Sequence, residues 1–385
     1  MTPDATNIAS RYLQRRVLLL SLVPLGMLFV ITATLARTYH ARQEGLARDW
    51  FRKGNADLSA GQPRLAFEDF RNSLSYNPED NLVQLRLAEA LLADGRLTEA
   101  RSYLTNLWDR TPGSGELNLD LAHLSQRTGD EEDAVRYFRS AIYGSWEKDP
   151  AQQRRSARLE LCQYLVNRGQ GSDAQVELAA LASDIPPEDV GLREVAGRLF
   201  LRVGEPGRAL AEFEATLQTS PHDEKLLEDA GRAAYTTGDY PKAENYFARA
   251  LRENPTSEIA GSLETIREVL AADPFQTGLS NEERARRSWD DFRQALESLQ
   301  KCMATGAPNQ AIGQTLSNIE IFNKDAQDMK RRANIVSLRR NPELRDEAMQ
   351  FVFRVEAAVS QSCGAPTGKD QALLLIARKH PGNNP

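Results

Sequence analysis

The sequence predicts an all-α fold in three parts: a single N-terminal transmembrane helix, a right-handed α-solenoid of about six helix pairs plus a capping helix, and a C-terminal helical bundle. Three observations predict this fold. A charge-free apolar segment lies near the N-terminus, one glycine–alanine spacing recurs through the middle, and apolar residues recur at steps of three and four near the C-terminus. We place the boundaries at 1–16 for a short tail, 17–36 for the transmembrane helix, 47–273 for the solenoid and 280–380 for the bundle.

The composition excludes two classes of protein. With 41% hydrophobic and 26% charged residues, the chain resembles folding proteins rather than intrinsically disordered ones. Its formal net charge is −6, and no basic run is interleaved with aromatic residues. Because nucleic-acid-binding proteins present a basic face, we expect no nucleic-acid partner.

The segment Val17–Ala36, VLLLSLVPLGMLFVITATLA, contains no charged residue. A helix of this length rises about 30 Å, which is enough to cross the hydrocarbon core of a bilayer. A cleaved signal peptide is the alternative, but its apolar region usually has only about 7–15 residues, and TLA before Arg37 is a poor cleavage site. We predict an uncleaved anchor that contacts membrane lipid through residues 17–36 in a bacterial inner membrane.

The orientation of this anchor is only weakly specified by the basic residues. Three arginines precede the apolar segment and three follow it within a short distance: Arg11, Arg15, Arg16, Arg37, Arg42 and Arg48. Because RYLQRR lies directly against the apolar segment, like the charged leader of a signal anchor, we favour a single-pass protein with the bulk of its chain in the periplasm. The opposite orientation, with the bulk in the cytoplasm, stays open.

Six glycine–alanine pairs, each with the alanine five residues after the glycine, organise the middle of the chain. The pairs are Gly61/Ala66, Gly95/Ala100, Gly129/Ala134, Gly169/Ala174, Gly204/Ala209 and Gly238/Ala243. Four residues after each alanine stands a large apolar residue: Phe70, Leu104, Phe138, Leu178, Phe213 and Phe247. Seven residues before each glycine stands a small one: Gly54, Ala88, Ala122, Cys162, Gly197 and Gly231. A longer connection around Tyr143–Gln153 separates the third unit from the fourth.

This spacing is typical of repeated helix pairs. The first helix of each pair ends at the glycine, which adopts a left-handed conformation at low cost. The second helix carries alanine where the two backbones approach closely, and its large residue fills the seam. After the last unit, Ile259, Leu263, Ile266 and Leu270 share one helical face, which predicts a helix that caps the solenoid.

The spacing resembles the tetratricopeptide repeat family, a 34-residue helix–turn–helix repeat with small residues at two packing positions and a terminal proline. The resemblance covers roughly residues 47–256, and the family's early tryptophan is matched once, by Trp50. It implies that the first helices of successive repeats line a concave groove that binds other proteins. Projection onto that face gives apolar candidates in the first three units and arginine-bearing ones in the last two: Phe51, Asn55, Leu82, Leu85, Leu92, Leu119, His123, Arg198, Arg202, Lys225, Arg232 and Tyr235. For each of these residues, ordinary surface or packing between repeats is the alternative.

The region from about Ser280 predicts a small bundle of helices. Three amphipathic stretches carry apolar stripes, and KDQALLLIARKH predicts a last short helix. Cys302 and Cys363 each lie near the C-terminal end of a predicted helix, the first and the third of this module. In an up-down-up bundle these ends meet, which favours a disulfide in an oxidising compartment. Two unrelated thiols are the alternative, and Cys162 is expected to be a buried small hydrophobe.

The sequence carries no recognisable catalytic or metal-binding motif. Its histidines, His40, His123, His222 and His380, are scattered without a second ligand at metal-binding spacing, and GAPTGKD lacks the spacing of a phosphate-binding loop. We therefore predict no enzyme activity, no cofactor and no metal. The predicted function is a membrane-tethered scaffold that binds membrane or envelope proteins. A constitutive subunit of a larger membrane complex, or an accessory regulator of an envelope enzyme, stays open as an alternative.

Overall fold

The computed structural model describes the backbone of residues 5–255, 257–305, 322 and 324–380. It describes side chains within these ranges from residue 24 onward, apart from 257, 258 and 305. Every regular element in the described ranges is a helix, and an isolated bridge between Ser114 and Ser145 is their sole strand-like feature. The all-α prediction is confirmed for this part of the chain. The chain divides into two compact units, residues 1–161 and 162–385, with the boundary inside α7 (Pro150–Asn167).

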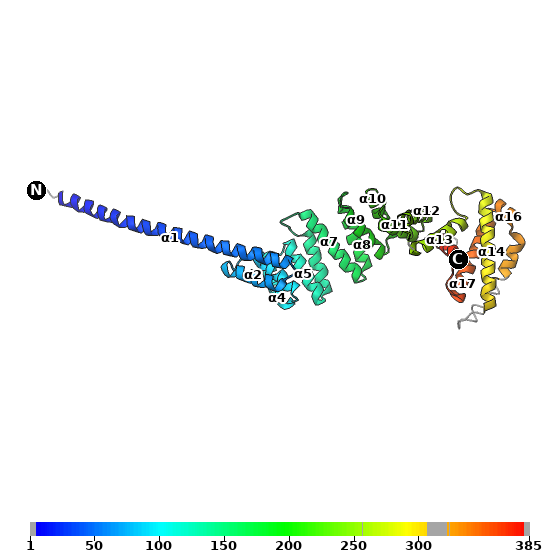
Figure 1. Cartoon of the computed structure of the whole chain (residues 1–385), viewed down its shortest axis with the longest axis horizontal. Coiled ribbons are helices and arrows are strands. Elements are labelled where there is room, and N and C mark those ends of the chain that lie inside the picture. Colours follow the sequence, from blue (N-terminus) through cyan, green and yellow to red (C-terminus); the bar gives the residue numbers. More distant parts are fainter. Residues whose placement is uncertain (1–4, 256, 306–321, 323, 381–385) are drawn as a thin grey trace. The chain divides into compact units, whose positions relative to one another are not determined.

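In the first unit, the helices from α1 to α6 each contact the next one along the chain (Figure 1). Their bounds are α1 (Ala5–Ser59), α2 (Pro63–Tyr76), α3 (Asn81–Ala93), α4 (Leu97–Arg110), α5 (Gly115–Thr128) and α6 (Glu131–Tyr143). The connections between them are short, so each helix folds back against its predecessor. The unit is therefore a row of helix pairs.

Helix α1 is far longer than its neighbours, at 55 residues, and includes Pro24 without ending there. Figure 1 shows it as one rod that extends well past α2. Its C-terminal turns serve as the first helix of the first pair: the Ser73 hydroxyl of α2 donates to the Ala47 carbonyl at 2.8 Å, and Lys53 pairs with the buried Asp69 at 2.9 Å. The first repeat is therefore continuous with the chain's N-terminal helix.

The helices of the described region include none that is both long and apolar enough to cross a membrane. The side chains of Val17–Val23, which begin the predicted anchor 17–36, lie outside the described residues.

The six repeat glycines all adopt the left-handed backbone conformation predicted for them. Their φ angles are 71° at Gly61, 82° at Gly95 and Gly129, 73° at Gly169, and 77° at Gly204 and Gly238. Residues with a Cβ are disfavoured there, so glycine lets each first helix end and the chain turn back. The alanine that follows each glycine is fully buried, and the large apolar residue after it is at most 3% exposed. The sequence pattern therefore marks the turn and the helix–helix seam of each pair.

The longer connection after the third pair is fastened to the start of α5. The Gly115 amide donates to the Ser145 carbonyl at 2.8 Å, and the Ser145 amide donates to the Gly113 carbonyl at 2.9 Å. The Trp146 indole lies directly against Gly115 and donates to the Ala141 carbonyl at 3.0 Å. Trp146 stands twelve residues after the alanine of the third pair, where the other five pairs carry proline: Pro78, Pro112, Pro186, Pro221 and Pro255.

The second unit contains the remaining repeat helices and the C-terminal helices. Its elements after α7 are α8 (Gly171–Asp184), α9 (Val190–Arg202), α10 (Pro206–Leu217), α11 (Glu224–Thr237), α12 (Tyr240–Glu253), α13 (Ser257–Ala272), α14 (Asn281–Thr305), α16 (Ile335–Arg340), α17 (Pro342–Cys363) and α18 (Gly368–Lys379). Helices α8 to α13 each contact the next, while α14 contacts α16, α17 and α18. The unit thus joins a run of repeat helices to a helical bundle.

The middle helix of the predicted bundle is broken near its end. The second amphipathic stretch of this module, residues 311–336, has an apolar stripe that predicts burial of Ala333 and Val336 together with Ile312, Leu316 and Ile319, and these last three lie outside the described residues. Ala333 is buried, but Val336 is 53% exposed. The prediction was wrong for Val336 because Asn334 caps a new helix, α16: its side-chain oxygen accepts from the amides of Val336 and Ser337, both at 3.0 Å.

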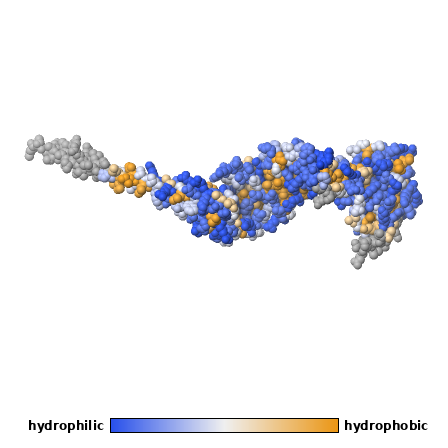
Figure 2. Space-filling model, in the orientation of Figure 1, coloured by the Kyte–Doolittle hydropathy of each residue, from blue (hydrophilic) through white to orange (hydrophobic). Residues whose placement is uncertain are grey.

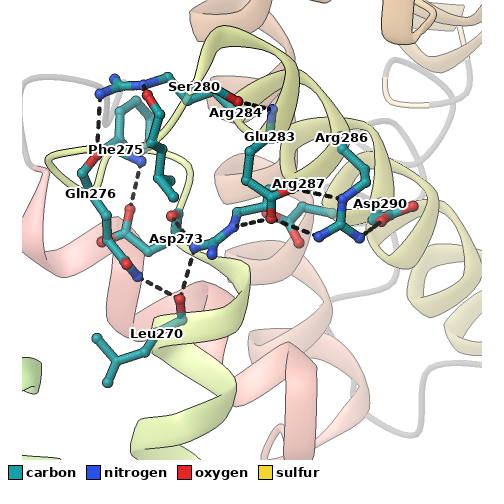
Figure 3. A network of polar contacts seen from close by, with 12 residues as sticks. Leu270, Asp273, Phe275, Gln276, Ser280, Glu283, Arg284, Arg286, Arg287 and Asp290 are labelled. Atoms are coloured by element: carbon teal, nitrogen blue, oxygen red, sulfur yellow. Dashed lines mark hydrogen bonds and ion pairs between the residues drawn. The ribbon is translucent and has the colours of Figure 1, made fainter.

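The turn between α13 and α14 is held by arginine side chains (Figure 3). Arg287 of α14 donates to the carbonyls of Leu270 at 2.8 Å and Asp273 at 3.0 Å. Arg284 donates to the Gln276 carbonyl at 3.1 Å. These bonds satisfy carbonyl groups at the end of α13 that have no partner within the helix, so the joint between the last repeat helix and the bundle is fixed.

Helix α18 returns to the end of the repeat region. It contacts α13, and the Tyr240 hydroxyl at the start of α12 donates to the Leu375 carbonyl of α18 at 3.3 Å. Helix α13 buries Ile259, Leu263 and Ile266, as predicted for a capping helix. It does not form an outer surface by itself, because α18 covers part of it.

The sulfur atoms of Cys302 and Cys363 form a disulfide between the ends of α14 and α17, with Cα atoms 5.7 Å apart. Cys162, at the small-residue position of the fourth repeat, is buried and takes no part in a disulfide.

Candidate protein-binding groove

Within each unit, the first helices of the pairs lie on one side. In the first unit, α1 contacts α3 and α3 contacts α5, although a second helix separates each pair in sequence. In the second unit, α9 contacts α11 in the same way. Since the second helices pack against these first helices from the other side, each unit presents a face made of first helices. We call this face the first-helix face.

The predicted apolar residues of this face lie at very different depths. Leu82 is 45% exposed at the start of α3. Leu85 and Leu92 are only 7% and 6% exposed and belong to the hydrophobic core of the first unit. Phe51 is half-buried with its ring centroid 5.9 Å from that of Phe70, and Leu119 is half-buried. Most of these apolar side chains therefore pack between helices of the first unit. Leu82 has the largest exposed fraction of the five.

The polar candidates of the first unit have partners within it. The Asn55 amide donates to the Phe51 carbonyl of its own helix at 3.0 Å. His123 Nε2 and Glu160 Oε2 of α7 lie 2.5 Å apart, and the imidazole ring meets Phe138 edge-on with centroids 6.0 Å apart. His123 therefore links α5 to α6 and α7.

A hollow of about 370 Å³ opens between α3 and α5 on the first-helix face of the first unit. The residues that line it are Glu89, Leu92, Asp120, His123, Gln126 and Arg127. Leu92 and His123 were predicted to bind a partner, whereas Glu89, Asp120, Gln126 and Arg127 were not. We call it the acidic hollow because its carboxyl groups outnumber its free cationic groups.

The basic residues at the acidic hollow are already engaged. Arg86 donates through Nη1 to both Glu89 carboxylate oxygens at 2.7 Å and through Nη2 to Glu116 at 2.8 Å. Arg127 donates to the Leu92 carbonyl. These bonds hold the rim of the hollow in place and leave Asp120 without a paired arginine.

Asp120 is the carboxyl group that the site leaves without a partner. Its side chain lines the hollow, the residue is 8% exposed, and its Oδ2 atom is buried without a hydrogen bond. Burial raises its pKa well above the ordinary value, and the nearby carboxyl groups of Glu89, Glu116 and Glu160 raise it further, while Arg86 lowers it. Burial likewise raises the pKa of Glu89, against the lowering effect of Arg86. The hollow therefore disfavours negative charge in its empty state.

The candidates in the second unit form ion pairs and hydrogen bonds across neighbouring helices. Arg198 pairs with Asp229 of α11 at 2.7 Å and with Glu194 of its own helix. Arg202 donates to the Asn167 side chain at 2.9 Å, and Arg232 lies 3.6 Å from Glu228. Lys225 is exposed, and the Tyr235 ring meets that of Tyr240 edge-on at 5.9 Å. This part of the face is a network of paired charges.

The described residues contain no group of three or more histidine, cysteine or acidic side chains arranged to hold a metal ion. The acidic hollow has carboxyl groups, but Arg86 lies between two of them. Its chemistry suits hydrogen-bond donors that carry positive charge rather than a bare cation.

Two curated relatives show what the chain is similar to. It is 24% identical over 255 residues to the cellulose synthase 1 operon protein C of Komagataeibacter xylinus, covering 63% of this chain and 17% of the relative. It is 26% identical over 174 residues to tetratricopeptide repeat protein 21A of Mus musculus, covering 44% of this chain and 12% of the relative. The chain thus spans less than a fifth of the length of either relative.

Solved structures give a similar result at lower identity. PilW, a type IV pilus biogenesis factor, is 19% identical, with 57% of this chain and 98% of that chain covered and a TM-score of 0.41. YrrB, described as having an unusual peptide-binding site, is 18% identical, with 50% and 95% covered and a TM-score of 0.39.

Family models of the tetratricopeptide repeat match three stretches of the chain, residues 51–115, 91–143 and 194–258. These stretches contain five of the six glycine turns and alanine seams described above, and the pair of Gly169 and Ala174 lies outside them. Over residues 51–143 and 194–258 this chain is therefore similar to tetratricopeptide repeats.

Proposed function

We propose that this protein is a non-catalytic scaffold that holds another protein on its first-helix face while α1 tethers it to a bacterial inner membrane. The observation that carries the proposal is the acidic hollow between α3 and α5, which opens on that face. Leu82, on the first helix α3 and seven residues before Glu89 of the hollow, adds an exposed apolar side chain. Protein interfaces combine apolar anchors with directional polar groups.

The described part of α1 supports the tether. Its large apolar side chains are more than half exposed over a continuous stretch: Leu25, Met27, Leu28, Phe29, Val30, Ile31 and Leu35. The hydroxyls of Thr32 and Thr34 donate to carbonyls of their own helix at 2.9 to 3.0 Å. Each hydroxyl proton is therefore hydrogen-bonded within the helix and does not require a water molecule as acceptor. Figure 2 shows hydrophobic surface on this part of the rod. Water disfavours such a surface, whereas lipid favours it.

The disulfide between Cys302 and Cys363 supports a periplasmic location for the bulk of the chain. Disulfides persist in the periplasm, whereas the cytosol keeps most thiols reduced. With α1 continuous into the first repeat, the groove would lie close to the outer surface of the inner membrane. This position suits a partner that is itself a membrane or envelope protein.

A pair of matched leucine variants tests the binding face. The full-length protein, extracted in mild detergent, serves as bait in affinity purification, with Leu82→Asp on the first helix α3 and Leu65→Asp on the second helix α2. Both leucines are exposed, at 45% and 54%, so neither change should disturb folding. We expect Leu82→Asp to lose the co-purifying partner and Leu65→Asp to retain it. Equal retention by both variants would contradict binding on this face.

The same extract separates a scaffold from a permanent subunit. A partner that co-purifies in fixed ratio through size-exclusion chromatography would favour a constitutive subunit of a membrane complex. A monomer that captures its partner only when the partner is added would favour a recruiting scaffold.

A further inference from the structure

The acidic hollow contains a buried carboxyl group that the repeat architecture does not need. Asp120 makes no ion pair, and its Oδ2 atom is buried without a hydrogen bond, although it lines an opening of about 370 Å³. A buried acceptor without a donor destabilises the fold, and proteins usually satisfy such groups. A donor from outside the chain would satisfy it.

The surroundings specify the charge of that donor. Four carboxyl groups act on this site, those of Glu89, Glu116, Asp120 and Glu160, against the guanidinium of Arg86. Arg86 is shared by Glu89 and Glu116, Arg127 donates to a backbone carbonyl, and His123 lies against Glu160. Arg127 keeps its positive charge, but the four carboxyl groups still outnumber the two guanidinium groups of Arg86 and Arg127, so the hollow has a surplus of negative charge when these carboxyl groups are ionised. A cationic donor would be attracted and an anionic one repelled.

We propose that the acidic hollow binds a lysine or arginine side chain of a partner protein, with the cationic group donating to Asp120. This proposal rests on the proposed function and adds the chemistry of the partner. The aliphatic part of the guest side chain lies against Leu92, and its charged end reaches Asp120, in the way that long basic side chains combine apolar and charged contacts. The polar rim of Gln126 and the Arg86–Glu89 pair then surrounds the guest.

This assignment predicts that binding strengthens as pH rises. The pKa of Asp120 is raised in the empty hollow by burial and by Glu89, Glu116 and Glu160, while Arg86 opposes the rise. A bound cation stabilises the ionised carboxylate, so binding requires loss of the carboxyl proton. His123, Arg127 and Gln126 also face the hollow.

Calorimetric titration of the full chain in non-ionic detergent tests the proposal. The probes are capped tetralysine, the same peptide with Nε-acetylated lysines, and spermine, which matches tetralysine in charge but is not a peptide. The variants are Asp120→Asn and Asp109→Asn, since Asp109 is an exposed aspartate on α4 and matches the change in charge. We expect Asp120→Asn to weaken tetralysine binding about tenfold or more and to abolish its rise with pH, while Asp109→Asn changes it less than about twofold.

Three results would overturn the proposal. Equal weakening by the two variants would show diffuse attraction to an acidic protein, and equal affinity for acetylated peptide would exclude a cationic guest. Spermine binding as tight as that of tetralysine would assign the hollow to small polyamines instead. Circular dichroism of Asp120→Asn shows whether the variant is folded, so that a loss of binding is not mistaken for a loss of structure. The comparison of Leu82→Asp with Leu65→Asp tests protein binding on the first-helix face separately. The proposal of a basic guest in the hollow can therefore be refuted without refuting the scaffold function.

Discussion

The backbone of Gly197 lies against the ring of Phe213, so that a Cβ at Gly197 would stand 2.5 Å from Phe213 Cε1. The same contact recurs at Gly54 with Phe70 and at Gly231 with Phe247, both at 2.6 Å. Where the small residue is larger, as at Ala88 and Cys162, the residue sixteen positions later is leucine, and Ala122 with Phe138 is the exception. The volume of one residue therefore sets the volume allowed at the other.

Gly197→Ala should destabilise the second unit despite its better helix propensity. Alanine gains about 1 kcal/mol over glycine in a helix, but the new methyl group overlaps the Phe213 ring and costs about 1–3 kcal/mol. We expect a lower urea midpoint, monitored by circular dichroism. Gly261→Ala is the matched control because nothing lies within 4 Å of its Cβ, and it should raise the midpoint.

The double variant Gly197→Ala with Phe213→Leu should recover part of the loss. It reproduces the alanine–leucine combination of the second repeat, Ala88 with Leu104. Recovery would show as a positive interaction in a double-mutant cycle. Additive losses would contradict the steric explanation.

The buried Glu356 should make stability fall with rising pH. Glu356 is 1% exposed, and burial, then the nearby Asp370 and Asp291, raise its pKa to about 8, against the lowering effect of Lys369. Since this folded-state pKa exceeds the ordinary 4.5, the contribution to stability is fully present below about pH 4.5 and lost as pH rises through 8. Glu356→Gln removes this titration while keeping the shape.

Denaturation midpoints at pH 5 and pH 9 check this expectation. Glu356→Gln should be more stable than the wild type at pH 9, by roughly a few kcal/mol, and close to it at pH 5. Glu297→Gln is the control, because Glu297 is exposed on α14. An identical pH dependence of the wild type and Glu356→Gln would show that Glu356 does not titrate in this range.

The disulfide should stabilise the C-terminal bundle. Its cysteines are 61 residues apart, and closing a loop of that length stabilises the folded state by about 4 kcal/mol through chain entropy. Cys302→Ser with Cys363→Ser should therefore lower the denaturation midpoint of this bundle. Peptide mapping without reductant, on native protein alkylated beforehand, should recover both cysteines in one cross-linked pair. Full alkylation of both thiols would contradict the bond.

The N-terminal segment should remain on the mature protein and hold it in the membrane fraction. The exposed apolar side chains of α1 from Leu25 to Leu35 account for this retention. N-terminal sequencing of native protein should begin before Val17, and protease added to spheroplasts should digest the repeats. A mature chain that begins after Ala36 would contradict an anchor, and full protection would place the repeats in the cytoplasm.

The sequence by itself determined the repeat register. Each mark of the pattern has a local physical cause: a left-handed turn needs glycine at Gly129, and close helix approach needs a small residue at Ala134. These causes act within one helix pair and recur with the repeat period, so spacing along the chain was enough to find them. The candidates on the first-helix face could be projected in the same way, but their exposure could not.

The tertiary structure alone decided which of those candidates are accessible and where the hollow lies. Leu85 and Leu92 satisfy the helical pattern of a surface, yet the neighbouring repeats cover them. Asp120 resembles any polar residue of α5 in sequence, and only the packing of neighbouring helices buries its carboxyl group near those of Glu89 in α3 and Glu160 in α7. The return of α18 onto α12 and α13 depends likewise on a contact between Tyr240 and Leu375. Such contacts join residues from different helices, and helical periodicity specifies the face of one helix without specifying what another helix brings to it.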